Sequence, residues 1–227
     1  MKTYYASGTV GDAYVILCKL YCVAKKEKVL CKHYTAYEKL RPVIKDIYSL
    51  IPNISVEFMN RRCPDAELTG VFHYRGEERE RNRYNLEPEY YPEFEAGDIG
   101  RFNPPEIYNA LQVKAGSHGY RGIPPEAIRR ILNGSKLPVV LIGENVATLP
   151  TESFDMMDLR GKTSVKEVVG IIKSSKRFYG PVGFLSFVAV SQQIISDVYT
   201  ESQEDVSAIK MRIEPVEEWR KFLTTRR

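Results

Sequence analysis

The sequence predicts an α/β protein with two Rossmann-like, doubly wound domains that face a cleft. Apolar runs of strand length alternate with amphipathic runs of helix length in both halves of the 227 residues. This rhythm stops over residues 60–104, which are rich in charge, tyrosine and proline, and then resumes. A loop containing glycine and serine follows a strand in the second half, the position at which open α/β sheets bind anionic ligands.

The first half, residues 1–104, is predicted to form an N-terminal Rossmann-like domain. Its helix at 37–50 places Leu40, Ile44 and Ile47 on one face, the spacing of an amphipathic helix. Because strands and helices alternate, we expect right-handed crossovers and a parallel sheet. The expected elements are a strand at 3–6, a helix at 13–24, a strand at 29–33, the helix at 37–50 and a strand at 54–59.

Residues 60–104 lack a periodic pattern. Such a long stretch without clear elements is unusual in a compact domain, so we expect a variable, irregular segment here. The mixed-charge run at 75–83 is interpreted as a solvated loop. The linker to the second domain is expected to end near 103–105, where the sequence reads Asn-Pro-Pro.

The second half, residues 105–214, is predicted to form a C-terminal Rossmann-like domain. Ser164 or Thr163 can cap a helix there, with Glu167 at the spacing of a capping box. A final helix at 215–224 has Trp219 and Phe222 in its apolar stripe. The other expected elements are strands at 110–114, 138–143, 158–161, 177–179 and 193–198 and helices at 125–132, 164–174 and 184–191.

Composition and charge argue against several classes of protein. The net charge of +4 comes from interspersed charges, which gives no strong indication of nucleic-acid binding. No apolar run approaches the ~20 residues that span a bilayer, and no signal peptide is evident, so we expect a cytoplasmic protein. The cysteines form no C-x-x-C pair and the three histidines are scattered, so no metal site is expected. We expect reduced, buried thiols, with Cys18 and Cys22 on the buried side of the first helix.

The loop after the first strand of the second half is the main candidate for a binding site. Lys114, Gly116 and Ser117 lie where that strand ends, and Arg121 follows on the same loop. Pro125 then opens a helix, since proline in a first turn loses no available hydrogen bond. Backbone amides, a hydroxyl and a fixed positive charge together favour a phosphate ligand, so we expect a nucleotide diphosphate here.

Two further positions in the second half are candidates for contact with a nucleotide. Gly183 and Phe184 begin a predicted helix, whose unpaired amides and dipole attract an anion. Glu144 follows a strand that ends in glycine, and acidic residues in nucleotide-binding folds meet a ribose there.

A small-residue turn in the first half holds a candidate carboxylate. Asp12 follows Gly8 and Gly11 at the start of the first helix, and the glycines let a substrate approach the backbone. An aspartate at a helix start is equally often a helix cap. Gly8-x-x-Gly11 is not the full G-x-G-x-x-G fingerprint, which disfavours a dehydrogenase.

These landmarks together resemble the heptosyltransferase-like glycosyltransferases, the ADP-heptose:lipopolysaccharide heptosyltransferase family of GT-B fold. The turn at 7–12 resembles the family's early loop, whose aspartate is the catalytic base, and this role falls on Asp12. Residues 114–126 resemble its phosphate-binding loop, 141–143 its glycine-ended strand, and 158–164 its turn before a helix. The resemblance covers residues 1–58 and 108–200. It implies that residues 1–104 form the acceptor side of the cleft and that residues 105–214 form the nucleotide-sugar-binding domain. It also implies a nucleotide-diphosphate sugar as co-substrate, no metal, and a closing helix at 215–227 that packs on the N-terminal domain with Trp219 as its anchor.

One departure from the family pattern leaves other functions open. The family has Asp-Ser/Thr-Gly-x-x-His where this chain has 181–186, so only Gly183 survives and Ser186 replaces the histidine. A catalytically degenerate nucleotide-sugar-binding protein is therefore one alternative to a metal-independent glycosyltransferase. A nucleotide-sugar epimerase of the same fold is another. The sequence does not identify the sugar, the base or the acceptor.

Overall fold

A computed structural model describes residues 1–61, 92–115, 121–144, 155–200 and 217–226. The chain divides into two compact units, Met1–Glu95 and Ala96–Arg227. Both are built from parallel strands joined through helices, which confirms the predicted α/β class.

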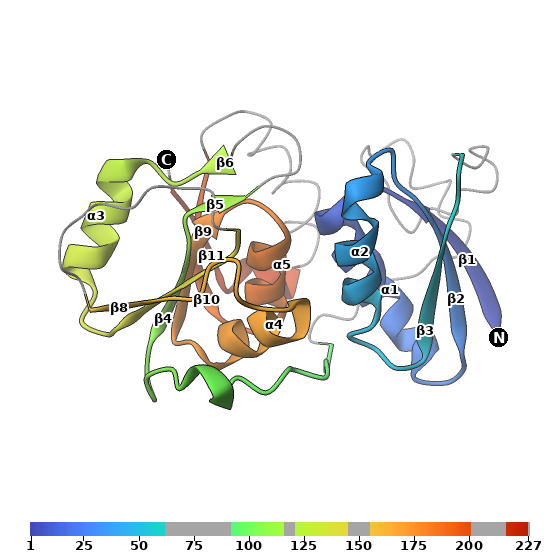
Figure 1. The fold of residues 1–227 in the computed structure, drawn as a ribbon, viewed down its shortest axis with the longest axis horizontal. Coiled ribbons are helices and arrows are strands. Elements are labelled where there is room, and N and C mark those ends of the chain that lie inside the picture. Colours follow the sequence, from blue (N-terminus) through green and yellow to red (C-terminus); the bar gives the residue numbers. More distant parts are fainter. Residues whose placement is uncertain (62–91, 116–120, 145–154, 201–216, 227) are drawn as a thin grey trace. The chain divides into compact units, whose positions relative to one another are not determined.

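The first unit is a three-stranded parallel sheet in the order β1-β2-β3. Each crossover moves the chain one strand further in the same direction, so right-handed connections place both helices on one face, as Figure 1 shows. The alternation predicted for the first half is confirmed. Its elements are β1 (Lys2–Ser7), α1 (Val10–Ala24), β2 (Val29–Tyr34), the 3-10 helix η1 (Glu38–Leu40), α2 (Arg41–Tyr48) and β3 (Ile54–Phe58).

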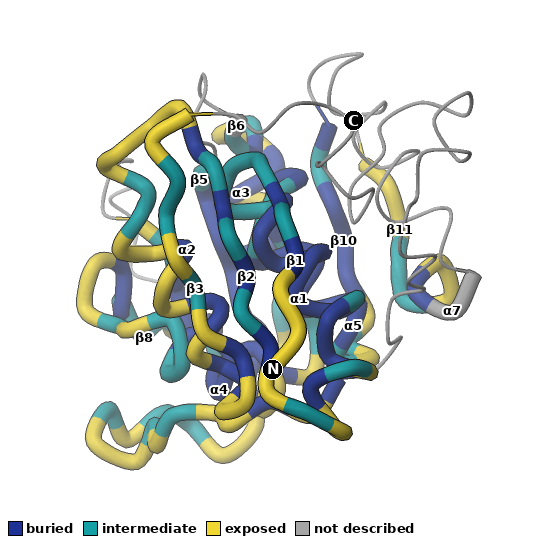
Figure 2. Tube along the Cα trace, turned by 90° about the vertical axis from the view of Figure 1, so that its right-hand side faces the viewer, coloured by how far each residue is buried: buried dark blue, intermediate teal, exposed yellow. Residues whose placement is uncertain are grey.

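The core of the first unit lies between this sheet and its two helices. Along β2 every second residue is buried, namely Val29, Cys31 and His33 (Figure 2). Because side chains alternate across a strand, these three share the face that carries the helices. From α2, Ile44 and Ile47 contribute fully buried side chains to the core of this unit.

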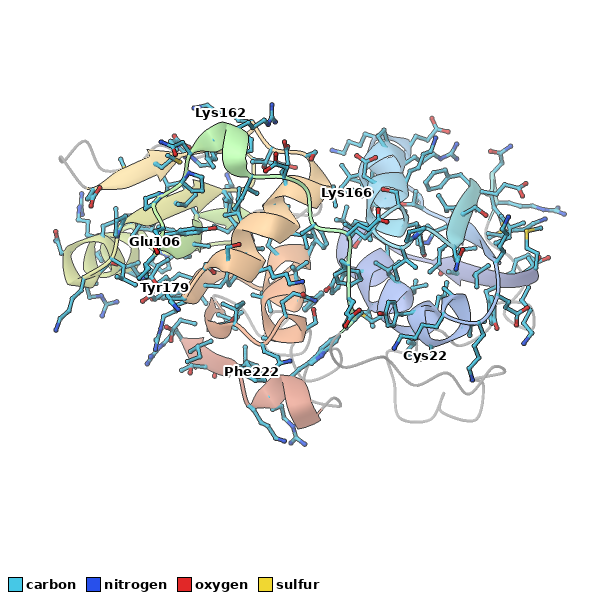
Figure 3. The ribbon with its side chains drawn as sticks, turned by 90° about the horizontal axis from the view of Figure 1, so that it is seen from below. Cys22, Glu106, Lys162, Lys166, Tyr179 and Phe222 are labelled. Atoms are coloured by element: carbon cyan, nitrogen blue, oxygen red, sulfur yellow. The ribbon has the colours of Figure 1, made fainter. Side chains whose placement is uncertain are left out.

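The exposure of one cysteine differs from the prediction. Cys18 and Cys31 are fully buried, but Cys22 is exposed on α1 (Figure 3). Residues four apart on a helix are separated by more than one full turn, and here that difference carries Cys22 beyond the buried face. The expectation of a buried thiol at Cys22 is therefore wrong. Cys63 lies outside the described residues.

The second unit contains a six-stranded parallel sheet in the order β11-β10-β9-β4-β7-β8. The chain starts in the middle at β4, adds two strands on one side, and then returns to add three on the other, which is the doubly wound Rossmann order. Its elements are η3 (Gly100–Phe102), β4 (Asn109–Gln112), β5 (Lys114–Ala115), β6 (Arg121–Gly122), α3 (Pro125–Gly134), β7 (Val139–Ile142), β8 (Met156–Asp158), α4 (Val165–Ser174), β9 (Arg177–Pro181), α5 (Phe184–Ser191), β10 (Ile195–Tyr199), α7 (Glu217–Arg220) and β11 (Leu223–Arg226).

Helices cover both faces of this sheet, with α3 on one face and α4 and α5 on the other (Figure 1). On the α3 side, Ile128 and Ile131 belong to one apolar cluster with Leu111 of β4 and Leu141 of β7. On the other side α4 begins at a capping box, since Ser164 donates its backbone N–H to the Glu167 carboxylate at 2.7 Å. The capping box predicted from the sequence is confirmed with Ser164 as the cap.

The end of the chain corrects one prediction. The expected helix at 215–224 is described only over Glu217–Arg220, and Leu223–Arg226 forms a strand that pairs in parallel with β10. The end of the described chain therefore adds the edge strand of the second sheet. Trp219 of α7 is fully buried, and its role as an anchor on the N-terminal domain stays a prediction. Within the described residues, no helix is both long and apolar enough to cross a bilayer.

Candidate functional site: the carboxyl edges of the two sheets

The strand order of the second unit defines a crevice. From β4 the chain moves to β7 on one side, and β9 occupies the other side, so neighbouring connections diverge between β4 and β9. In open α/β sheets, ligands bind outside the carboxyl ends of the strands at this switch point. Two segments singled out in the sequence follow the carboxyl ends of these two strands, the segment after Gln112 and the one after Pro181.

The structure brings these two segments into contact. Lys114 and Ala115 form β5, which pairs antiparallel with Arg121 and Gly122 of β6. A Cβ added to Gly183 would lie 3.3 Å from the Ala115 Cβ, so the predicted loop and the predicted helix start are neighbours. Of the other predicted loop residues, Gly116 and Ser117 lie outside the described residues. The backbone of Arg121 is described but its side chain is not.

The contacts at the start of α5 show what Ser186 does at the position where the family pattern has a histidine. The Gly183 N–H donates to the Ser186 hydroxyl at 3.0 Å, and that hydroxyl donates to the Gly183 carbonyl at 2.8 Å. Ser186 is fully buried, so its hydroxyl acts within the first turn of its own helix. Phe184 is the first residue of α5. The positive end of this helix dipole therefore lies at the carboxyl edge of the sheet.

Gln112 is a residue that the sequence reasoning missed. It ends β4 at the centre of the sheet and is 7% exposed, and its buried Oε1 has no hydrogen-bond partner among the residues that the structure describes. Its side chain packs against two glycines: a Cβ on Gly143 would lie 3.3 Å from the Gln112 Cγ, and one on Gly180 would lie 3.4 Å from its Cβ. Buried polar groups nearly always have partners, so this oxygen marks a place for a donor at the switch point. The available signal was a polar residue ending an apolar central strand.

The next strand ends carry further polar groups. Gly143 ends β7 with a φ of +95°, a conformation that favours glycine, and the predicted Glu144 beyond it is exposed. At the end of β8, the Arg160 guanidinium donates to both carboxylate oxygens of Asp158, at 2.9 and 2.7 Å. This bidentate contact lowers the pKa of Asp158. Lys162 is exposed beside η3 (Figure 3), and its Nζ donates to the Asp158 carbonyl oxygen at 2.7 Å.

At the carboxyl edge of the first sheet, the structure places Gly8, Gly11 and Asp12 together. Asp12 is the third residue of α1 and is 3% exposed, and its Oδ2 accepts from the Thr9 N–H at 2.7 Å and from the Thr9 hydroxyl at 3.1 Å. Gly8 has a φ of +141°, and a Cβ there would lie 2.4 Å from the Asp12 Cβ. Gly8 therefore makes room for the aspartate side chain. Asp12 contributes to the helix cap, and its catalytic role remains a prediction.

His33 is a second residue that the sequence reasoning missed. Its ring is fully buried between the Tyr48 hydroxyl, 3.0 Å from Nδ1, and the Gly8 carbonyl oxygen, 3.2 Å from Nε2. Burial lowers the pKa of His33 to about 4, so the imidazole is neutral near pH 7. Burial also raises the pKa of Cys31, whose thiol donates to the same Tyr48 hydroxyl, to about 12.

A metal centre finds no ligand set in the described part of the chain. No group of three or more histidine, cysteine, aspartate or glutamate side chains is placed to hold an ion among those residues. The polar groups at the two carboxyl edges include backbone amides and carbonyls, the buried amide of Gln112, the helix-capping carboxylate of Asp12 and the neutral imidazole of His33.

Comparison by sequence finds no matching protein family and no matching curated protein. Comparison of structures finds similar folds. The E. coli ADP-heptose lipopolysaccharide heptosyltransferase II has a TM-score of 0.58 at 12% identity, over 90% of this chain and 86% of that one. The E. coli heptosyltransferase WaaC with ADP-2-deoxy-2-fluoro heptose has a TM-score of 0.57 at 11% identity, over 100% and 93%.

A third similar structure carries a metal. The dodecameric, iron-containing heptosyltransferase TibC from enterotoxigenic E. coli, in complex with ADP-D-beta-D-heptose, has a TM-score of 0.53 at 14% identity. The match covers 87% of this chain and 57% of the TibC chain. These likenesses confirm that the chain has the heptosyltransferase-like fold that its motifs indicate.

Proposed function

We propose that this protein is a glycosyltransferase that moves a sugar from a nucleotide-diphosphate donor to an acceptor hydroxyl. The observation that carries the proposal is the switch point of the second sheet. There the segment at Lys114 and Ala115 contacts the start of α5 at Gly183, and the buried Gln112 oxygen has no partner in the described part of the chain. Structures of similar fold that hold an ADP-sugar support the choice of donor class.

The diphosphate is proposed to bind across the two segments that meet at the switch point. Ser117 would supply a hydroxyl and Arg121 a forked cation, while the amides at the start of α5 and its dipole would stabilise the negative charge. These groups stabilise the leaving diphosphate without a metal ion, which is the part of transfer chemistry that most needs electrostatic help. Glu144 would meet the ribose.

Asp12 is proposed as the general base. The acceptor hydroxyl gives its proton to the Asp12 carboxylate while its oxygen forms a bond to the anomeric carbon. The bond from that carbon to the diphosphate breaks, and the nucleoside diphosphate leaves with the electron pair. The Asp12 Oδ2 accepts from the Thr9 N–H and hydroxyl, and the ionised carboxylate would be the group that takes the acceptor proton.

A binding protein without transferase activity is the second candidate. It is favoured by the Ser186 hydroxyl, which serves its own helix start where the family has a histidine, and by the capping contacts of Asp12. Turnover of a labelled nucleotide sugar separates the two candidates. Transfer of label to an acceptor supports the enzyme, and tight binding without turnover supports the binder.

Nucleotide binding tests the proposed donor site. A nucleoside diphosphate should raise the melting temperature, because a ligand that binds only the folded state stabilises it. Arg121→Ala should weaken that binding by roughly ten- to a hundredfold, since a hydrogen bond to a charged group contributes about 1.5–3 kcal/mol. Lys136→Ala is the matched control, because Lys136 is an exposed cation in the turn before β7, at the opposite edge of the sheet. Equal losses in both variants, or none in Arg121→Ala, would show that the phosphate site is elsewhere.

A further inference from the structure

A buried chain of hydrogen bonds runs through the first unit to the loop that carries Asp12. The Cys31 thiol donates to the Tyr48 hydroxyl at 3.3 Å, the hydroxyl lies 3.0 Å from His33 Nδ1, and His33 Nε2 lies 3.2 Å from the Gly8 oxygen. These three side chains are each at most 1% exposed. These hydrogen bonds therefore link β2, α2 and the β1–α1 loop through side chains shielded from solvent.

The Gly8 carbonyl oxygen, at the end of this series of hydrogen bonds, determines which atom donates in each of them. The Gly8 carbonyl oxygen can only accept, so His33 Nε2 must carry the proton. In a neutral imidazole the other nitrogen then accepts, so the Tyr48 hydroxyl donates to His33 Nδ1 and its oxygen accepts from the Cys31 thiol. Burial holds the pKa of His33 near 4, in agreement with this neutral tautomer.

The bond to Gly8 acts on Asp12 through a single peptide unit. The Gly8 carbonyl and the Thr9 N–H belong to the same planar group and point in opposite directions. The carbonyl oxygen is held by His33 at 3.2 Å, and the N–H donates to the Asp12 Oδ2 at 2.7 Å. A rotation of this peptide would break both contacts at once. Glycine has the freest backbone of all residues, so at Gly8 the two contacts, and not a side chain, restrict the rotation of this peptide.

We propose that His33 is a positioning residue: by holding the Gly8–Thr9 peptide, its Nε2–H keeps the Asp12 carboxylate oriented for proton transfer. The catalytic half of this inference rests on the proposed function of Asp12, whereas the structural half does not. The groups facing the His33 ring are the Gly8 carbonyl, Tyr48, Phe58 of β3 at 6.3 Å between ring centres, and the carboxylate of Asp12, whose charge raises the pKa of the ring against the larger effect of burial.

Two substitutions of His33 separate its contacts. In His33→Gln the side-chain amide reaches the position of Nε2 and can donate to Gly8, but it loses the acceptor for Tyr48. In His33→Asn the side chain reaches only the position of Nδ1, so it keeps the acceptor and loses the bond to Gly8. Ile47→Val is the matched control, because it removes one methyl group from a fully buried residue next to Tyr48 in α2.

Hydrogen exchange at the Thr9 amide in the intact chain tests the structural half. We expect exchange to be at least about tenfold faster in His33→Asn than in the parent, and near the parent rate in His33→Gln and Ile47→Val. The ring nitrogens of His33 in the parent protein give a test that needs no substitution, since ¹⁵N shifts should report the Nε2–H tautomer. Equal Thr9 protection in the Gln and Asn variants, or a Nδ1–H tautomer, would overturn the inference.

Transfer kinetics test the catalytic half. In His33→Asn we expect kcat to fall by about ten- to a hundredfold with the donor KM unchanged, because small misplacement of a catalytic group costs up to ~10² in rate. His33→Gln should recover most of kcat. If Thr9 loses its protection in His33→Asn while kcat is unchanged, Asp12 is not the base of the proposed reaction, and only the structural support of the peptide by His33 stands.

Discussion

The carboxyl edges of the two sheets differ in how their buried polar groups are used. At the first edge, the Gly8 carbonyl, the His33 ring and the Tyr48 hydroxyl bond to one another, and Asp12 bonds to Thr9. At the second edge, the Gln112 side chain lies next to Gly143 and Gly180, and its buried oxygen has no partner among the described residues. The first edge is organised to hold one carboxylate in place. The second has polar capacity left over for a ligand.

Among the proposed substitutions, Asp12→Asn at the first edge should change the rate of sugar transfer most. Asp12→Asn preserves the shape of the side chain and its ability to accept from Thr9, but it cannot take a proton. If Asp12 is the general base, kcat for sugar transfer should fall about 10²–10⁴-fold while nucleotide affinity stays unchanged. If Asp12 is only a cap, Asn should be tolerated, because Asn and Asp cap helices about equally well. Steady-state transfer assays decide, and full activity in Asp12→Asn would reject the catalytic role.

Gly8 tests how tightly the first edge is packed. Gly8→Ala places a methyl group about where the Asp12 side chain lies, at a φ of +141°, so we expect a loss of about 3 kcal/mol in the free energy of unfolding. Gly134→Ala is the control, since nothing lies within 4 Å of its added Cβ and alanine favours the helix that it ends. Denaturant unfolding measures both. Similar stability of the two variants would mean that the first edge accommodates the extra atom.

His33 gives the first edge a pH signature. Its pKa of about 4 in the folded protein lies below its ordinary 6.5, so the unfolded chain binds a proton that the folded chain does not. Stability from this residue is complete above pH 6.5 and is lost as the pH falls towards 4. Each pH unit between these values removes about 1.4 kcal/mol, or about 3 kcal/mol in all. The difference in unfolding free energy between the parent and His33→Gln should shrink by about this amount across that interval, and a constant difference would contradict the buried neutral ring.

The smallest expected effect concerns the second edge. Gln112→Leu removes a buried amide whose oxygen has no partner within the described ranges, so the free energy of unfolding should stay constant or rise slightly. Nucleoside diphosphate binding should weaken by about three- to tenfold, the effect of one neutral hydrogen bond. Calorimetry measures both quantities on one sample. A loss of stability with unchanged nucleotide binding would show that Gln112 has a structural partner and no ligand.

Much of this architecture follows from local patterns, and the exceptions have physical causes. The element types from 2 to 58 and the helix at 184–191 are set by periodicity and by glycine or proline at their ends. Phe222 and Trp219 have helical spacing, yet the next residues become a strand because β10 offers an edge to pair with. Short segments such as this are decided by their partner, which periodicity does not show.

Some residues of the candidate site were likewise predictable from local sequence patterns, and others were not. The loop at Lys114 and the helix start at Gly183 were predictable, because both follow strand ends in a known order of elements. His33 and Gln112 were not, because their significance depends on distant partners or on the lack of one. Gly8 lies 25 positions from His33, and the glycines next to the Gln112 side chain are Gly180 of β9 and Gly143, which follows β7. The sequence shows such residues only as one histidine and one glutamine in strands that also contain other polar residues.

The most direct test of the account is to map nucleoside diphosphate binding on the intact chain by amide chemical shifts. The switch point of the second sheet should respond, so the largest shifts are expected at Lys114, Ala115, Gly143 and Phe184, with little change at the opposite edge near Lys136. Shifts centred on that opposite edge, or saturating nucleotide with no shift at the four expected amides, would contradict the claim that this crevice binds the donor.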